Sequence, residues 1–248
     1  MTEITARGEK KLVLAAGRAH PELAREIAKE LGTELLPVDA YDFANGEIYV
    51  RAGESVRGTD AFVIQAHPAP LNNHLMAIPL LADYIRTRVA ADNITVVSPD
   101  TGRVRVAEQW AERLGGAPLA FVHKSRDLTV PNQAVSKTVV GQIEGRTCVL
   151  IDDMIDTGGT ISGAVQVLKN AGAKDVIIAA THAVFSDPAA RRLSESGARE
   201  VVVTDTLPIP ADKRFPQLTV LSIAPLIARA IREVFDDGSV TSLFDGNA

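Results

Sequence analysis

The stretch from Val149 to Thr160 reads Val-Leu-Ile-Asp-Asp-Met-Ile-Asp-Thr-Gly-Gly-Thr, and it is the part of the sequence that indicates the fold most clearly. An apolar run ends in two aspartates, a glycine-rich turn follows, and a pattern typical of an amphipathic helix begins at Thr160. Glycines let a backbone approach an anion closely, and a helix N-terminus offers N–H groups and the positive end of a dipole. The stretch therefore predicts a strand, a phosphate-binding turn and a helix, with hydroxyl donors from Thr157 and Thr160.

The two aspartates at the end of the strand predict a second part of the ligand. Asp152 and Asp153 would repel a phosphate at contact, so we expect them further along the ligand. There they can accept hydrogen bonds from the 2- and 3-hydroxyls of a ribose, directly or through a metal ion.

Three other interpretations of this stretch must be compared with this one. A Gly-Gly turn before a helix is often only a chain reversal. A Walker-type loop is excluded because no lysine follows the glycines. The spacing from Asp152 to Asp156 also matches the diphosphate-binding aspartates of terpene synthases. Those aspartates lie on helices, whereas an apolar strand precedes them here, so the strand–turn–helix interpretation is preferred.

The rest of the chain alternates short apolar runs with helical periodicity, which predicts an α/β fold with a mainly parallel sheet. The predicted strands are 12–15, 35–38, 48–50, 61–65, 95–98, 119–123, 147–151, 176–181 and 200–204. The predicted helices are 21–31, 104–114, 160–171, 188–196 and 223–235, and the predicted loops are 124–136 and 207–216. One stretch does not fit, because Pro79 lies inside the apolar segment 72–88, where it would interrupt a helix.

Composition limits the function classes. The chain has 248 residues, 46% hydrophobic and 23% charged, as in ordinary globular proteins. Its net charge of -5 and its 4% aromatic content argue against binding to nucleic acid. The single cysteine, Cys148, excludes a disulfide framework. No apolar stretch is long enough to cross a bilayer and the first residues resemble no signal peptide, so a cytoplasmic location is expected.

The run from Asp152 to Thr160 resembles the ribose-phosphate loop of the ribose-phosphate pyrophosphokinase (phosphoribosyl pyrophosphate synthetase) family. Other segments that resemble this family are Phe43-Ala-Asn-Gly-Glu-Ile48, Glu54-Ser-Val-Arg-Gly58, Val97-Ser-Pro-Asp100, Thr181-His182, Ser222-Ile-Ala-Pro-Leu226 and Ser239-Val-Thr-Ser-Leu-Phe244. Two further segments are most similar to the actinobacterial members: Gly17-Arg-Ala-His-Pro21 and Lys213-Arg-Phe-Pro216.

The resemblance implies a transferase of nucleotide biosynthesis that moves the diphosphoryl group of ATP to ribose 5-phosphate, giving phosphoribosyl pyrophosphate and AMP. It assigns ribose 5-phosphate binding to Asp152, Asp156, Thr157, Gly158, Gly159 and Thr160. It places Lys124 and Arg126 in a mobile loop. Lys124 is the implied catalytic residue, and Arg126 is a further implied ligand of ribose 5-phosphate. It assigns Mg²⁺ to Asp100, and ATP to Phe43, Asn45, Gly46 and Glu47. It further implies a homo-oligomer, a hexamer, with ATP sites shared between subunits.

The implied fold is a pair of stacked phosphoribosyltransferase-like α/β domains. Residues 1–77 form a truncated N-terminal domain on the ATP side, and residues 78–235 form the ribose 5-phosphate domain. Residues 236–248 return to the N-terminal domain.

The resemblance is interrupted near Met76–Ile78, where an internal segment of the family is missing. Two helix pieces are joined there, which accounts for Pro79. The missing part includes the family's Arg-Gln ATP loop and an Asp-Leu-His segment whose histidine helps to bind Mg²⁺. We therefore expect an enzyme of this family with impaired turnover. The alternative is a non-catalytic ribose-phosphate-binding or regulatory subunit. A base-specific phosphoribosyltransferase shares the loop but not the segments 43–48 and 239–244.

Overall fold

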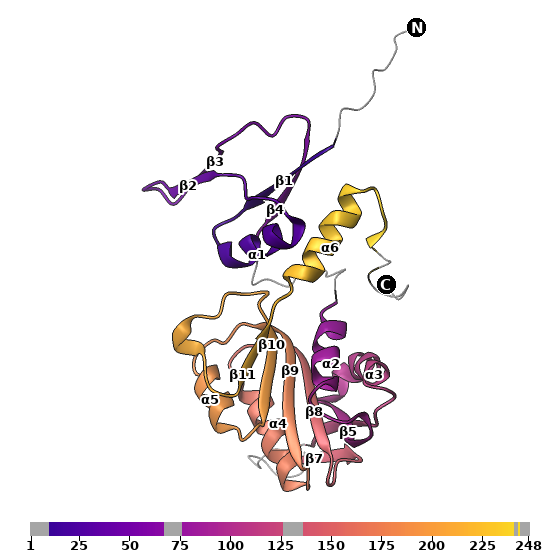
Figure 1. Cartoon of the computed structure of the whole chain (residues 1–248). Helices are drawn as coiled ribbons and strands as arrows, with labels where there is room; N and C mark the ends of the chain where they lie inside the picture. Colours follow the sequence, from indigo (N-terminus) through magenta and orange to yellow (C-terminus); the bar gives the residue numbers. More distant parts are fainter. Residues whose placement is uncertain (1–9, 67–75, 126–135, 241–242, 244–248) are drawn as a thin grey trace. The chain divides into compact units, whose positions relative to one another are not determined.

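The computed structural model describes residues 10–66, 76–125, 136–240 and 243. The chain divides into two compact units, one formed by Met1–Leu75 with Ser222–Ala248 and the other by Met76–Leu221 (Figure 1). The sequence-based boundaries follow residues 77 and 235, whereas this division falls after Leu75 and after Leu221. Helix α6 (Ala224–Phe235) belongs to the first unit, whereas the sequence-based boundary at residue 235 assigned it to the second.

The second unit is built on a seven-stranded sheet with the order β11-β10-β9-β8-β5-β6-β7. All neighbouring strands are parallel except β6 and β7, which are antiparallel. The strands are β5 (Ile94–Ser98), β6 (Leu119–Ser125), β7 (Ser136–Gly141), β8 (Thr147–Ile155), β9 (Asp175–Ala183), β10 (Glu200–Thr204) and β11 (Leu218–Leu221). The helices are α2 (Ile78–Arg86), α3 (Val104–Arg113), α4 (Gly159–Asn170) and α5 (Ala189–Glu195), with short 3₁₀ turns at Ala91–Asn93, Thr101–Arg103 and Ala211–Lys213.

Helices cover both faces of this sheet, which explains why its central strands are continuous apolar runs rather than alternating ones. In β8, Cys148 and Leu150 pack with residues of α4 and α5, whereas Val149 and Ile151 pack with residues of α2 and α3. Figure 1 shows α4 and α5 on one side of the sheet and α2 and α3 on the other. The buried sheet fixes the ends of its strands, where the candidate site lies.

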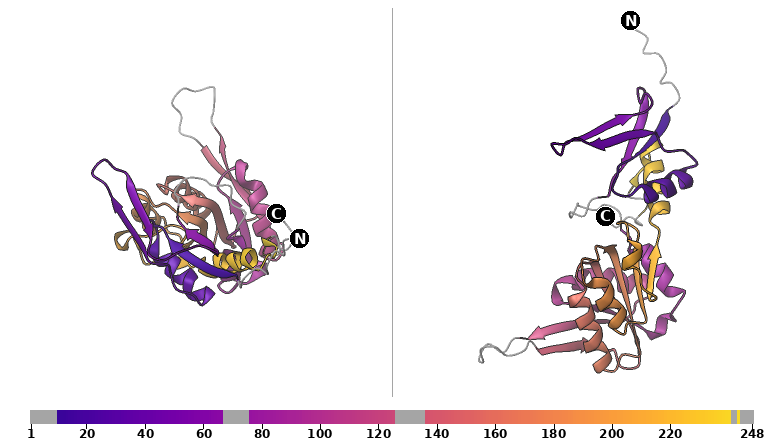
Figure 2. Two further views of the ribbon diagram at one scale, coloured as in Figure 1. Left: turned by 90° about the horizontal axis from the view of Figure 1, so that it is seen from above. Right: turned by 90° about the vertical axis from the view of Figure 1, so that its left-hand side faces the viewer.

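The first unit has much less sheet. Strands β1 (Lys11–Ala16) and β4 (Thr59–Ile64) form a parallel pair, and β2 (Val38–Asp42) and β3 (Ile48–Ala52) form an antiparallel hairpin. Helices α1 (Pro21–Leu31) and α6 belong to the same unit. In both views of Figure 2 the hairpin projects from the rest of this unit. Of the six residues of β1, only Leu14 is buried, and Val63 in β4 is 69% exposed.

The start of helix α2 explains how the chain accommodates Pro79. The helix begins at Ile78, so Pro79 lies in its first turn, where the missing N–H costs nothing. Within the described part of the segment, Pro79 therefore does not interrupt a helix. The boundary between the two units, at Leu75 and Met76, falls beside the predicted joint.

The predicted α/β class with a mainly parallel sheet is confirmed, but three element predictions were wrong. Strands β7 and β11 were not predicted: no element was assigned to the residues that follow the predicted loops 124–136 and 207–216. The strand predicted at 35–38 is displaced to Val38–Asp42, and Leu35 makes only an isolated bridge to Leu14. Within the described ranges, no helix is both long and apolar enough to cross a membrane.

Candidate active site

The candidate site lies where the order of the strands reverses. From β5 the chain passes to β6 on one side and later to β8 on the other side of β5. In open parallel sheets, ligands bind outside the carboxyl ends of the strands at such a reversal. Asp152 lies near the end of β8 and Asp100 follows the end of β5, so both aspartates reach this position.

A cavity of about 290 Å³ marks the same place. Its wall is formed by the end of β8, the following turn, the start of α4 and one side chain from the segment after β5. The lining residues are Arg103 and the continuous stretch from Asp152 to Ile161. The structure therefore brings together all six loop residues predicted to bind ribose 5-phosphate.

The turn before α4 depends on its glycines. Gly158 is the N-cap residue of α4, with a φ of +71°, a conformation that side chains with a Cβ rarely adopt. A Cβ at Gly158 would also lie 3.5 Å from the Cα of Ala189 in α5. The first N–H groups of a helix have no partner within the helix, so those at the start of α4 are available to an anion in the cavity.

Arg192 of α5 forms a hydrogen bond with this turn. Its Nη1 donates a hydrogen bond to the carbonyl oxygen of Thr157 at 3.1 Å. The same atom would lie 3.4 Å from a Cβ built on Gly159. A positive charge thus lies beside the predicted phosphate site.

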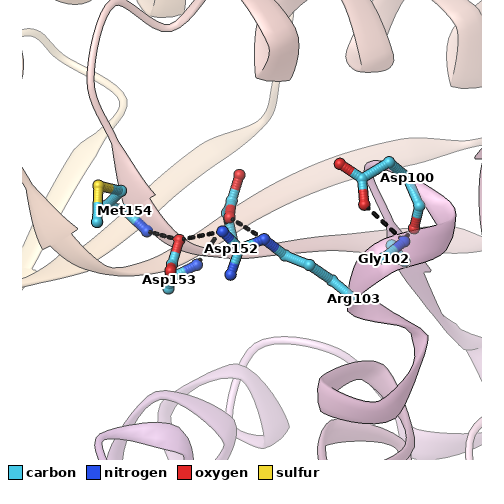
Figure 3. Close-up of polar contacts among 7 residues, drawn as sticks. Asp100, Gly102, Arg103, Asp152, Asp153 and Met154 are labelled. Atoms are coloured by element: carbon cyan, nitrogen blue, oxygen red, sulfur yellow. Dashed lines mark hydrogen bonds and ion pairs between the residues drawn. The ribbon is translucent and has the colours of Figure 1, made fainter. Parts of the chain in front are cut away.

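Arg103 contacts both aspartates at the end of β8 (Figure 3). Its Nε lies 3.0 Å from Oδ1 of Asp152, and its Nη2 lies 2.8 Å from Oδ1 of Asp153. Backbone N–H groups donate to the same oxygens, from Asp153 to Asp152 at 2.9 Å and from Met154 to Asp153 at 2.7 Å. The two carboxylates are therefore held in fixed orientations at the cavity wall.

Burial and mutual proximity change the pKa values of this pair. Burial raises the pKa of Asp152 to about 6, and the hydrogen bond with Asp153 acts in the same direction. Burial also acts to raise the pKa of Asp153, but hydrogen bonds from Asp152 and Arg103 outweigh it and lower that pKa. The guanidinium of Arg103 supplies the positive charge beside this pair.

Asp100 belongs to the same electrostatic group. Its Oδ1 accepts a hydrogen bond from the backbone N–H of Gly102 at 2.9 Å and caps the 3₁₀ turn that carries Arg103. Burial acts to lower the pKa of Arg103, but Asp153, Asp152 and Asp100 together raise it. Among the described residues, no group of three or more His, Cys, Asp or Glu side chains is arranged to hold a metal ion.

The four residues predicted to contact ATP lie together in the first unit, in the turn between β2 and β3: Phe43, Asn45, Gly46 and Glu47. The N–H of Phe43 donates to the carbonyl of Glu47 at 2.8 Å, which closes the turn. The ring of Phe43 packs edge-on against Tyr41 and Tyr49, yet 45% of Phe43 is exposed. Exposed aromatic rings at the tip of a hairpin are available for stacking with a flat ligand.

The predicted catalytic loop is only partly described. Lys124 is the second-last residue of β6, the strand next to β5. Arg126 lies outside the described residues. Lys124 is thus on the strand beside the reversal point, on the opposite side of β5 from Asp152.

Sequence reasoning missed Arg103 and Arg192. For Arg103 a signal existed, because it comes three residues after Asp100, directly beyond a predicted strand end. For Arg192 no local signal existed, since its position depends on how α5 packs beside the loop.

A strand-end aspartate pair, a glycine turn and a helix N-terminus meet at the reversal point, and together they define an α/β protein with a candidate ligand site at the carboxyl ends of its strands. Two family models match the chain. The N-terminal domain of ribose phosphate pyrophosphokinase matches residues 12–114, and the phosphoribosyl synthetase-associated domain matches residues 120–245. The chain belongs to the ribose-phosphate pyrophosphokinase family.

Individual relatives agree with this assignment. The ribose-phosphate pyrophosphokinase of Mycobacterium tuberculosis is 50% identical over 317 aligned positions, which cover 96% of this chain and 97% of the relative. That of Corynebacterium glutamicum is 46% identical over the whole of both chains. The crystal structure of phosphoribosylpyrophosphate synthetase from Mycobacterium smegmatis superposes with a TM-score of 0.83 at 47% identity, covering 92% of this chain and all of that chain.

This chain is shorter than its relatives. The alignment with the M. tuberculosis protein has 317 positions, 69 more than the 248 residues of this chain, so at least 69 positions hold none of its residues. The predicted family membership and the predicted loss of a segment are both confirmed.

Proposed function

We propose that this chain is a ribose-phosphate diphosphokinase whose turnover is impaired by the missing segment. In the proposed reaction, the 1-hydroxyl of ribose 5-phosphate attacks the β-phosphorus of ATP and loses its proton. The bond between the β-phosphorus and the oxygen that bridges it to the α-phosphate breaks. The products are phosphoribosyl pyrophosphate and AMP.

The observation that carries the proposal is the cavity lined by Arg103 and the stretch from Asp152 to Ile161. The helix N-terminus at Gly158 and Gly159 supplies N–H donors for the 5-phosphate, and Thr157, Thr160 and Asp156 line the same wall. Asp152 lies at the far end of this stretch, where carboxylate oxygens can accept hydrogen bonds from ribose hydroxyls. We assign a ribose 5-phosphate to this cavity, with Arg126 as a further ligand by family resemblance.

By family resemblance, we assign ATP to the β2–β3 turn and Mg²⁺ to Asp100. Phe43 is exposed enough to stack on adenine, and Asn45, Gly46 and Glu47 share its turn. Asp100 offers carboxylate oxygens, the donors that Mg²⁺ prefers, and this ion commonly takes only one or two protein carboxylates with water and phosphate oxygens. Asp100 therefore fits as a Mg²⁺ ligand, and the bound ion would neutralise charge on the phosphoryl oxygens.

Lys124 and Arg126 complete the proposed machinery. Phosphoryl transfer depends mainly on positioning and on cations near the developing charge. Lys124, on the strand beside β5, is assigned to that role. We also propose the family's hexameric assembly and a cytoplasmic location for this chain.

The missing segment argues for slow turnover. Each lost contact to the transition state is worth about 2–4 kcal/mol, so several losses slow phosphoryl transfer by many orders of magnitude. The same deficit of at least 69 positions favours a second candidate, a non-catalytic subunit that binds ribose 5-phosphate.

One experiment separates the two candidates. Purified protein is incubated with ATP, Mg²⁺ and ribose 5-phosphate, and ³¹P NMR follows AMP and phosphoribosyl pyrophosphate. Slow formation of both products, abolished in Lys124→Ala, supports the enzyme. No product from folded protein that still binds ribose 5-phosphate supports the non-catalytic subunit.

A further inference from the structure

Arg192 joins helix α5 to the turn that precedes α4. The helix packs closely on this turn, because Cα of Ala189 and Cγ of Leu193 each lie 3.5 Å from a Cβ built on Gly158. Both of these α5 residues are buried. The hydroxyl of Ser162 in α4 donates a hydrogen bond to the carbonyl oxygen of Arg192 at 3.2 Å. The backbone of Arg192 is therefore held beside the turn by contacts with both helices.

The guanidinium of Arg192 fixes the orientation of one peptide group in the turn. Its Nη1 donates a hydrogen bond to the carbonyl oxygen of Thr157 at 3.1 Å. The peptide bond between Thr157 and Gly158 is trans, and in a trans peptide the C=O and the N–H point in opposite directions. The N–H of Gly158 therefore points away from Arg192. Among the described residues, Thr157 and Gly158 line the cavity and Arg192 does not, so Arg192 acts on the cavity through the turn.

Arg192 also brings a positive charge that no carboxylate balances. Among the described residues it forms no ion pair, whereas Arg103 is paired with two aspartates. The carboxylates of Asp152, Asp153 and Asp156 lie along the cavity wall and would repel a phosphate. A phosphate monoester carries a charge of about −1.5 to −2 at neutral pH, where a guanidinium stays protonated. A cation beside the turn therefore favours phosphate binding.

We propose that Arg192 is a positioning residue for the 5-phosphate of ribose 5-phosphate. Through the carbonyl of Thr157 it holds the N–H of Gly158 toward the phosphate, and its charge offsets part of the repulsion from the aspartates. The inference rests on the proposed function, because it assumes that ribose 5-phosphate occupies the cavity with its phosphate at this turn. It differs from an alternative in which Arg192 only connects α5 to the turn and affects stability alone.

Isothermal titration calorimetry of the full chain with ribose 5-phosphate, in buffer with Mg²⁺, tests the proposal on the wild type and three variants. Arg192→Ala removes the donor and the charge, and it should weaken binding by about 5- to 20-fold, a moderate loss because Arg192 is exposed. Arg192→Lys keeps a donor and the charge, so its affinity should lie within about 3-fold of the wild type. Arg192→Gln keeps a donor but loses the charge, so it should bind more weakly than Arg192→Lys.

Arg191→Ala is the matched control, since Arg191 is the neighbouring exposed arginine of α5 and its loss changes the net charge equally. It should bind ribose 5-phosphate as the wild type does, and thermal unfolding of each variant checks the fold. If Arg192→Ala fails to fold, the other two variants decide. Binding by Arg192→Gln as tight as that by Arg192→Lys, or tighter, would overturn the proposal.

The remaining outcomes are also decisive. Unchanged or tighter binding by folded Arg192→Ala contradicts the proposal, even if its Tm falls, because only the alternative of a purely structural role predicts that result. A loss in Arg192→Lys as large as that in Arg192→Ala contradicts it, as does an equal loss in Arg191→Ala. Absence of wild-type binding would instead show that the proposed function itself is wrong and would remove the basis of the inference.

Discussion

Gly158 illustrates how single residues determine the phosphate-binding turn. Gly158 has a φ of +71°, which side chains with a Cβ rarely adopt, whereas the Cα of Ala189 at 3.5 Å from a built Cβ is an ordinary contact. Gly158→Ala should lower the free energy of unfolding by about 1–2 kcal/mol because of backbone strain. Urea denaturation measures this change.

Gly159→Ala is the control for that prediction. Gly159 is the next residue and begins α4 with an ordinary helical conformation, so alanine there should be neutral or slightly stabilising. Equal destabilisation by both variants would show that the positive φ of Gly158 is not what matters.

His182 provides a pH-dependent test at the residue scale. Burial lowers the pKa of His182, although the nearby Asp153 acts to raise it, and the ring lies 2.9 Å from the hydroxyl of Thr206. The unfolded chain therefore takes up a proton below about pH 6.5 more readily than the folded chain does. The stability contribution of neutral His182 is present above that pH and is lost as the pH falls through the folded pKa.

His182→Gln should consequently reduce the fall in Tm between pH 7.5 and pH 5. An unchanged pH profile in His182→Gln would contradict the role assigned to its burial.

At the scale of elements, the first unit should be the less stable one. Its parallel pair, β1 and β4, has only two strands, and Leu14 is the single buried residue of β1. Leu14→Ala should cost about 2–5 kcal/mol, as large-to-small changes in a core do. Hydrogen exchange followed by mass spectrometry should show faster exchange in the first unit with Met76–Leu221 still protected. Equal loss of protection in both units would contradict the division into two stability units.

The elements nearest the site were the most predictable from sequence. The start of α4 was predicted at Thr160 and lies at Gly159, because strand, turn and helix signals coincide there. Strand β11 was missed because its four residues follow the proline-rich stretch 207–216, and only pairing with β10 makes them a strand. Arg103 was missed for a similar reason, since its partners lie about fifty positions along the chain and meet it only through the pairing of β5 with β8.

At the scale of the whole molecule, we expect the missing segment to limit the rate of the proposed reaction. The second unit has a seven-stranded sheet with a cavity at its strand ends, whereas the described part of the first unit has two strand pairs. We predict that inserting the corresponding segment of the M. tuberculosis relative between Met76 and Ala77 raises turnover by at least about 100-fold, since each restored contact is worth about 2–4 kcal/mol. AMP formation measures the rate. Equal rates with and without the insert would mean that the missing segment is dispensable.

The central claim is that the stretch from Asp152 to Thr160 binds ribose 5-phosphate. Calorimetric titration of the folded chain with ribose 5-phosphate, compared with Asp156→Ala and with Asp92→Ala as an exposed control on the same unit, tests this claim most directly. We predict saturable binding by the wild type and by Asp92→Ala, weakened at least about 10-fold in Asp156→Ala. No binding by the wild type, or equal binding by all three proteins, would contradict it.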